Sequence, residues 1–137
     1  MTDRKNENYI GLNFFDFEFP HEIITKKLML TPTNSKVKGA TRIGDLLWKE
    51  NIWHYEEKKV TDEYIGDLVE EFILRVIAPI RGKIKEILNE CNGEIAIAQF
   101  YYNGCNPGCH FSKDILSLIG ETGLEIDIDT YLSLIHI

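Results

Sequence analysis

The segment from Thr61 to Cys91 constrains the fold most, because it is the longest stretch with a single apolar period. Two acids, Asp62 and Glu63, follow Thr61, as at the capped start of a helix. Apolar residues then recur at steps of three and four, which predicts a helix with one buried stripe: Ile65, Leu68, Val69, Phe72, Val76, Ile80, Ile84, Ile87 and Leu88. A helix of this kind has to bury its stripe, so we expect a sheet beneath it.

Pro79 interrupts the middle of this segment. Its ring clashes with the carbonyl four residues back, and it has no N–H to donate. The apolar phase nevertheless continues on both sides of the proline. We therefore predict a kinked helix, or two coaxial halves, that stops at Asn92 and Gly93, since both residue types tolerate the left-handed conformation that closes helices.

Four other stretches have the composition of strands. They span residues 8–19, 52–57, 94–102 and 124–131. In the first, the apolar residues change parity at Phe14 and Phe15, and a bulge there would restore one apolar face. In the third, Ala96 and Ala98 are small enough for a closely packed helix to lie above them, which predicts an interior strand.

Two short helices complete the pattern. One follows Pro20, and the other spans residues 113–119, with Ser112 as its cap and Gly120 at its end. Residues 31–40 are rich in turn formers and are predicted to be loop. The resulting order predicts an α+β fold, a two-layer sandwich with about four mostly antiparallel strands, helices on one face and the other face open.

Length and composition fit one globular domain over residues 1–131. The last six residues, 132–137, read LSLIHI, which is the translation of a transposon-derived sequencing adapter. We expect this tail to be non-native, and we exclude it, with His136, from the predicted fold and site. The other interpretation is a genuine extension of the last strand, for which Leu132 and Leu134 have the right parity.

The chain is acidic, with 15 basic and 22 acidic residues and a net charge of −7. This balance disfavours nucleic acid or an anionic membrane as the partner and suits a cationic protein. No apolar run approaches the roughly 20 residues of a membrane span, and no secretory signal is evident. Three cysteines without such a signal favour reduced thiols and a cytoplasmic location.

The order of several residues resembles the bacterial domain of unknown function family 4279, over nearly the whole chain. They are Pro20, Ile23, Thr25, Leu28, Leu30, Pro32, Thr33, Gly39, Trp53, Asp129, Thr130 and Tyr131. The resemblance implies a compact single domain with no established enzyme chemistry, so it transfers no catalytic residue. Trp53, and Asp129 with Tyr131, match the family's tryptophan and its acidic-aromatic ending, and we expect them to be structural first.

The cysteine and histidine residues that lie closest together in the sequence are Cys105, Cys109 and His110, within NGCNPGCH. A zinc site needs four soft ligands, so Cys91 or His54 would have to complete this one. A short-loop disulfide and an inert loop are the other two interpretations. Neither a nucleophile-elbow serine nor a glycine-rich phosphate loop is present, and no cofactor is predicted.

Glu125, Asp127 and Asp129 lie on one face of the last predicted strand, about 6.8 Å apart at roughly 3.4 Å per residue. Such carboxylates can bind a hard cation, act as acid and base, protect an edge strand, or dock a basic partner. Aromatic residues could line the open sheet face and there assist binding: Trp53, Tyr55, Tyr101 and Tyr102. The candidate partner-binding residues are Glu125, Asp127, Asp129, Trp53 and Tyr55.

These features favour a non-enzymatic cytoplasmic binding protein. We expect an immunity protein that neutralises a cationic bacterial toxin encoded next to it, since electrostatic complementarity would give fast association. The alternative is a metal-binding or enzymatic domain centred on the loop with Cys105, Cys109 and His110.

Overall fold

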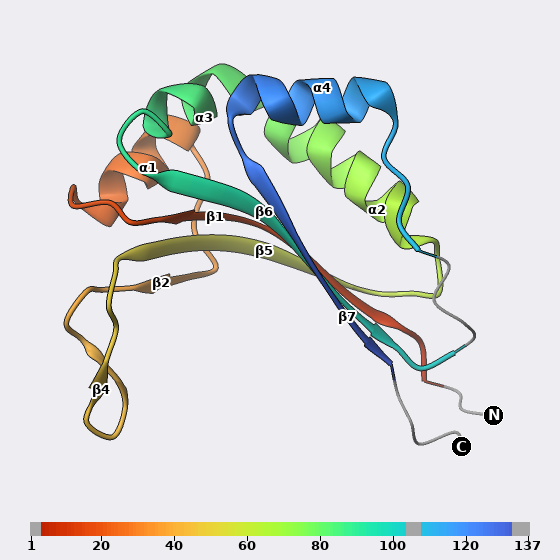
Figure 1. The fold of residues 1–137 in the computed structure, drawn as a ribbon, viewed down its shortest axis with the longest axis horizontal. Coiled ribbons are helices and arrows are strands. Elements are labelled where there is room, and N and C mark those ends of the chain that lie inside the picture. Colours follow the sequence, from red (N-terminus) through yellow and green to blue (C-terminus); the bar gives the residue numbers. More distant parts are fainter. Residues whose placement is uncertain (1–3, 104–107, 133–137) are drawn as a thin grey trace.

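The computed structural model describes residues 4–103 and 108–132, which form a five-stranded sheet with helices on one side (Figure 1). The strand order is β2-β5-β1-β6-β7, antiparallel throughout except for the parallel pair β6 and β7. The strands are β1 (Glu7–Phe15), β2 (Asn34–Lys36), β5 (Ile52–Val60), β6 (Asn92–Tyr101) and β7 (Glu125–Leu132). The helices are α1 (His21–Leu28), α2 (Ile65–Phe72), α3 (Arg81–Ile87) and α4 (Lys113–Thr122).

The mixed, mostly antiparallel fold and its open face are confirmed, but the sheet has five strands, not four. The additional strand is the short β2, which lies within the segment predicted to be loop and pairs with β5 at the edge of the sheet. Residues 132–137 were predicted to be a non-native tail; Leu132 ends β7, and residues 133–137 lie outside the described part of the chain.

The first strand lies in the centre of the sheet, between β5 and β6. Its side chains Ile10, Leu12 and Phe14 point toward the helices and are essentially unexposed. The bulge predicted near Phe14 and Phe15 is wrong, since both neighbours pair with β1 in continuous register to its last residue. The parity changes because the strand ends there and Asp16 takes a φ of 60°, which returns Phe17 to the core.

The long helical segment is continuous from Ile65 to Ile87 but is not one regular helix. Between α2 and α3 it contains a π-helical turn (Ile73–Ile77) and a 3₁₀ turn (Ala78–Ile80) that holds Pro79. The segment changes direction there (Figure 1), as expected at a proline beside a π-bulge. The π-helical turn holds about one residue more per turn than an α-helix, and this shifts the buried stripe onto Ile77. Ile77 is fully buried, whereas the predicted Val76 is only half-buried.

The predicted helix ends also shift. The α2 helix begins at Ile65, four residues after the expected cap Thr61, whose hydroxyl accepts a hydrogen bond from the Glu63 N–H instead. At α4, Ser112 is the N-cap as predicted, because its Oγ accepts from the Ile115 N–H at 3.3 Å. That helix ends at Gly123, with a φ of 86°, and runs through the predicted stop at Gly120.

The core lies between the sheet and the helices. Ile95 and Ile97 of β6 face the helices, so Ala96 and Ala98, which alternate with them, point to the open face, opposite to the prediction. A buried polar group closes one end of this layer: the Asn8 side chain donates to the carbonyls of Lys59 and Thr61, and the Gln99 amide donates to Asn8 at 2.8 Å. These bonds fix the connection from β5 to α2.

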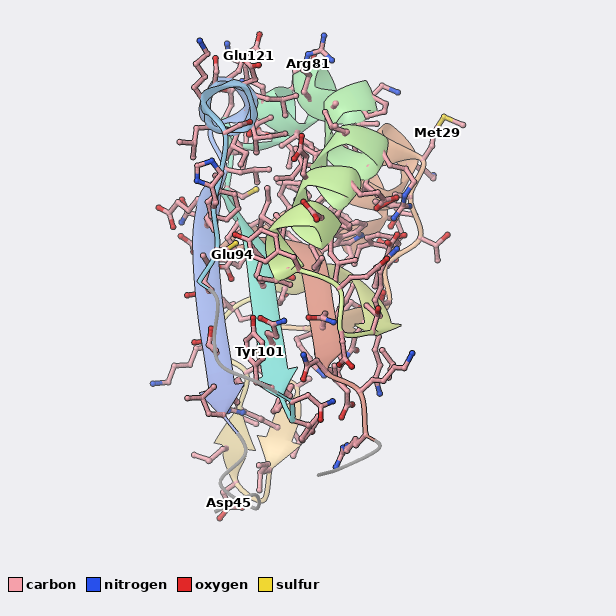
Figure 2. The ribbon with its side chains drawn as sticks, turned by 90° about the vertical axis from the view of Figure 1, so that its right-hand side faces the viewer. Met29, Asp45, Arg81, Glu94, Tyr101 and Glu121 are labelled. Atoms are coloured by element: carbon pink, nitrogen blue, oxygen red, sulfur yellow. The ribbon has the colours of Figure 1, made fainter. Side chains whose placement is uncertain are left out.

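A hairpin arm, residues 37–49, projects from the β2 end of the sheet on the side away from the helices (Figure 1). It contains β3 (Thr41–Ile43) and β4 (Leu46–Leu47), joined at Gly44, whose φ of 55° suits a two-residue hairpin loop. In Figure 2 its tip, Asp45, lies at the opposite end of the molecule from Arg81 and Glu121 of the helical layer. None of the described helices is long and apolar enough to cross a membrane.

Candidate functional site

The predicted acidic stripe lies on the open face of the sheet. In β7, Glu125, Asp127 and Asp129 alternate with residues that point toward the helices, and all three acids are exposed. The parallel register places Glu94 of β6 beside Glu125, and the two alanines of β6 beside the aspartates. The acids of β7 are therefore continued onto the neighbouring strand.

Small residues lie at the centre of the open face. Gly11 of β1 lies between Ala96 of β6 and Glu56 of β5. A Cβ on Gly11 would come within 2.7 Å of the Tyr55 carbonyl oxygen and 3.3 Å of the His54 ring, so the position accepts only glycine without movement of its neighbours. Acids from β5, β6 and β7 thus lie around a region of small residues.

Polar side chains connect the acids across three strands. His54 Nδ1 contacts Asn13 Oδ1, and His54 Nε2 lies 3.5 Å from a carboxylate oxygen of Glu56. The Asn13 amide in turn donates to Glu94 Oε1 at 3.3 Å. The arrangement fixes the orientation of both carboxylates. No sequence pattern indicates this network, because the alignment of β5, β1 and β6 is set by pairing between distant segments.

One end of the open face is already neutralised. Glu7 accepts hydrogen bonds from the hydroxyl of Tyr102 at 2.9 Å and from Arg4 at 2.7 Å, and Lys58 lies 3.1 Å away. These three groups lower the pKa of Glu7 to about 2. Glu7 therefore adds no unpaired charge to the face, unlike the β7 acids, which form no ion pair within the described residues.

Aromatic rings border the same end. Phe100 stacks on Tyr131 with ring centroids 4.7 Å apart, and meets the edge of Tyr9 at 5.9 Å. Tyr131 is 49% exposed. Of the four aromatic residues predicted for the open face, Tyr102 lies at this end, where its hydroxyl donates to Glu7, whereas Trp53, Tyr55 and Tyr101 do not lie on this face.

Trp53 lies on the opposite face of the sheet from the acids. It is fully buried, and its indole N–H donates to Thr25 Oγ1 at 3.0 Å. It is therefore a core residue, as its match to the family pattern suggested, and it is not available on the surface as a partner-binding residue.

Tyr55 also points toward the helices, and so does Tyr101. The Tyr55 ring stacks on Phe72, and its hydroxyl donates to Glu57 at 2.6 Å. Arg75 holds the pKa of Glu57 below its usual range, so Tyr55 belongs to a network at the helical edge. The predicted five-residue set is thus divided between two faces: Glu125, Asp127 and Asp129 lie on the open face, and Trp53 and Tyr55 point toward the helices.

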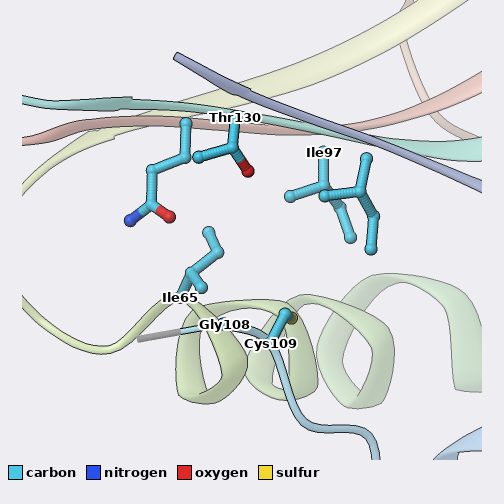
Figure 3. A pocket seen from close by; sticks show the side chains of 7 residues that line it. Ile65, Ile97, Gly108, Cys109 and Thr130 are labelled. Carbon is cyan, nitrogen blue, oxygen red and sulfur yellow. The ribbon is translucent and has the colours of Figure 1, made fainter. Parts of the chain in front are cut away.

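A cavity of about 220 Å³ lies between the sheet and the start of α2. Figure 3 shows Ile65, Gly108 and Cys109 on one side of it, facing Ile97 and Thr130. Burial raises the pKa of the Cys109 thiol, which disfavours the thiolate that nucleophilic attack and metal binding require. The described residues that line the cavity include no carboxylate and no imidazole.

The predicted metal cluster is only partly within the described residues, since Cys105 lies outside them. Cys91 and Cys109 are free thiols, and burial raises the pKa of Cys91 to about 11. Within the described residues, no three His, Cys, Asp or Glu side chains are placed to hold a metal ion together. The acidic open face is therefore the better-formed candidate site.

Comparison with known proteins assigns a family to this arrangement. No solved structure matches the chain. The family model described as "Domain of unknown function (DUF4279)" matches residues 6–133, which include the whole sheet and every helix described above. The chain therefore belongs to the DUF4279 family.

Proposed function

We propose that this chain is a non-enzymatic cytoplasmic binding protein that docks a cationic protein partner on its open face. The observation that carries the proposal is the acidic surface made by Glu56, Glu94, Glu125, Asp127 and Asp129, which covers three strands. Such a surface attracts a basic partner and repels an acidic one.

The surface is suited to binding for a second reason. Its centre, beside Asp127 and Asp129, carries the small side chains of Ala96 and Ala98, whose partly exposed methyl groups are available for contact. Its carboxylates are held in place by the His54 and Asn13 side chains, so ordering them costs less entropy on binding. The specific form we expect is an immunity protein that masks a basic toxin domain encoded beside it.

Co-purification with the product of the adjacent gene tests the proposal. We expect a stable pair, and we expect the double variant Asp127→Lys with Asp129→Lys to weaken its affinity by about a hundredfold, since like charges across an interface cost several kcal/mol. The matched control is Glu70→Lys with Glu121→Lys, two exposed acids on the helical side, which changes net charge equally. Equal affinities for the two double variants would contradict the role of the open face.

The alternative, a metal-binding or enzymatic domain at the cysteine loop, is tested separately. Elemental analysis of protein purified without chelators measures bound zinc or iron per chain. One metal ion per chain, lost in the Cys109→Ser variant, would favour the alternative. Metal-free protein that retains its partner would favour the binding function.

A further inference from the structure

The hairpin arm exposes more apolar surface than a free loop requires. Four of its side chains are more than half exposed, at 54% for Val37, 69% for Ile43, 62% for Leu46 and 54% for Leu47. They lie on a short two-stranded arm that projects beyond the sheet (Figure 1). A cluster of exposed aliphatic side chains of this kind marks a contact surface.

The arm is also cationic. It contains Lys38, Arg42 and Lys49 against one acid, Asp45. Arg42 lies over the Trp48 ring, with its Cζ 5.0 Å from the ring centroid, and Lys36 lies over the same ring at 5.1 Å. Within the described residues no ion pair involves Arg42 or Lys49. The arm therefore presents positive charge beside aliphatic side chains.

The acidic open face has the complementary properties. Its unpaired acids lie on β7 and β6, and its centre and one end offer methyl groups and the aromatic rings of Phe100 and Tyr131. One chain thus carries both an apolar cationic arm and an acidic face with apolar regions. The arm's exposed side chains show that the two do not meet within a single copy.

We propose that the arm of one copy docks on the open face of a second copy, so that the protein self-associates through these two surfaces. The arm projects from the side of the sheet that carries the open face, so two copies placed face to face about a two-fold axis each present an arm to the partner's face. The reciprocal contact doubles the buried area, and the arms supply the positive charge that keeps two acidic faces from repelling each other.

Other self-contacts fit the structure less well. Direct pairing of two β7 edges in antiparallel fashion would bring the acids of the two strands close together, and like charges on paired strands are destabilising. Contact between two open faces without the arms would bring the same acids together. The arm therefore decides the mode of association.

A charge-swap experiment tests the proposal in the full chain. The arm variant is Arg42→Glu with Lys49→Glu, and the face variant is Asp127→Lys with Asp129→Lys. Sedimentation equilibrium at low ionic strength should show a dimer for the wild type, and a dissociation constant about tenfold weaker or more for each variant alone. An equimolar mixture should restore the dimer, because every arm then meets a face of opposite charge. A misfolded variant could not be rescued in this way.

A control variant, Lys83→Glu with Lys85→Glu in α3, changes the net charge equally on the helical side and should dimerise like the wild type. The proposal is overturned if the wild type is monomeric over a micromolar to millimolar range, or if the mixture of variants stays monomeric. It is also overturned if a strictly monomeric protein binds vesicles of anionic phospholipid through the arm.

The proposed self-association rests on the same open face as the proposed function, but experiment can refute either one without the other. The arm variant should lose self-association and keep the toxin-like partner, whereas the face variant should lose both. A monomeric wild type whose partner binding is lost only in the face variant would remove the dimer and leave the proposed function standing. If the dimer forms again when the two variants are mixed, but the protein binds no cationic partner, the self-association stands and the proposed function is removed.

Discussion

At the scale of single residues, the ionisation of Glu7 links stability to pH. Its pKa is lowered from 4.5 to about 2 in the folded protein by Tyr102, Arg4 and Lys58. A carboxyl group with a depressed folded pKa stabilises the fold above its unfolded pKa and loses that contribution as the pH falls toward the folded pKa. The stabilisation by Glu7 is therefore complete above about pH 4.5 and absent near pH 2.

Urea unfolding of the wild type and of Glu7→Gln between pH 2 and pH 6 measures this effect. Near pH 6 the wild type should have the larger free energy of unfolding, and its difference from Glu7→Gln should shrink as the pH falls. Glu70→Gln, which removes an exposed acid of α2, should show no such convergence. A constant difference between wild type and Glu7→Gln across the range would contradict the assignment.

The same substitution at two glycines should have opposite effects. Gly11→Ala brings a methyl group to 2.7 Å from the Tyr55 carbonyl oxygen, which is backbone and can move only with its strand, so we expect a loss of about 1–3 kcal/mol. Gly120→Ala adds a methyl group inside α4 with no atom within 4 Å, and should gain about 0.5–1 kcal/mol. Denaturant midpoints of the two variants give the comparison.

The limits of sequence reasoning are clearest in the residues of the open face. The alternation of Glu125, Asp127 and Asp129 was visible in the sequence. The network of His54, Asn13 and Glu94 was not, because it depends on which strands are neighbours and in which register. Trp53 was a candidate for the surface because an indole suits both a core and an interface, and composition does not separate the two.

At the scale of elements, the contribution of the α4 N-cap to stability can be tested by substitution. The Ser112 hydroxyl accepts a hydrogen bond from the Ile115 N–H, which would otherwise lack an intrahelical partner. Ser112→Ala should cost about 1 kcal/mol of unfolding free energy. Ser117→Ala, in the exposed interior of the same helix, should be neutral or slightly stabilising, since alanine has the higher helix propensity. Equal losses at both positions would show that the cap contributes nothing.

The sequence predicted the regular elements well and the irregular ones poorly. Four strands and the helical segments follow from periodicity, which depends only on residues near in the chain. Strand β2 and the hairpin arm were missed because they lack alternation and are almost wholly exposed. The bulge was predicted because a change of parity has two causes, an inserted residue or the end of the strand, and here Asp16 supplies the second.

At the scale of the whole molecule, the separation of charge predicts how partner binding responds to salt. The acidic face steers a basic partner from a distance, and salt screens such interactions beyond about 10 Å at 0.1 M ionic strength. Raising the salt concentration should therefore slow association with the partner and change dissociation much less. Stopped-flow or surface-based kinetics at several salt concentrations measure both rates. The control variant Glu70→Lys with Glu121→Lys should keep most of the salt dependence, and the face variant should lose it.

The position of β1 in the sheet has a consequence for how the chain folds. The N-terminal strand pairs on one side with β5 and on the other with β6, so that Glu7 is opposite both Val60 and Phe100. A nascent chain leaving the ribosome therefore holds its first strand without its second neighbour until residue 101 has been synthesised. Because most of the pairing joins distant segments, folding is expected to be slow for a domain of this size. Until β6 arrives, one edge of β1 keeps its backbone N–H and C=O groups unpaired, and such an edge leaves the chain open to aggregation.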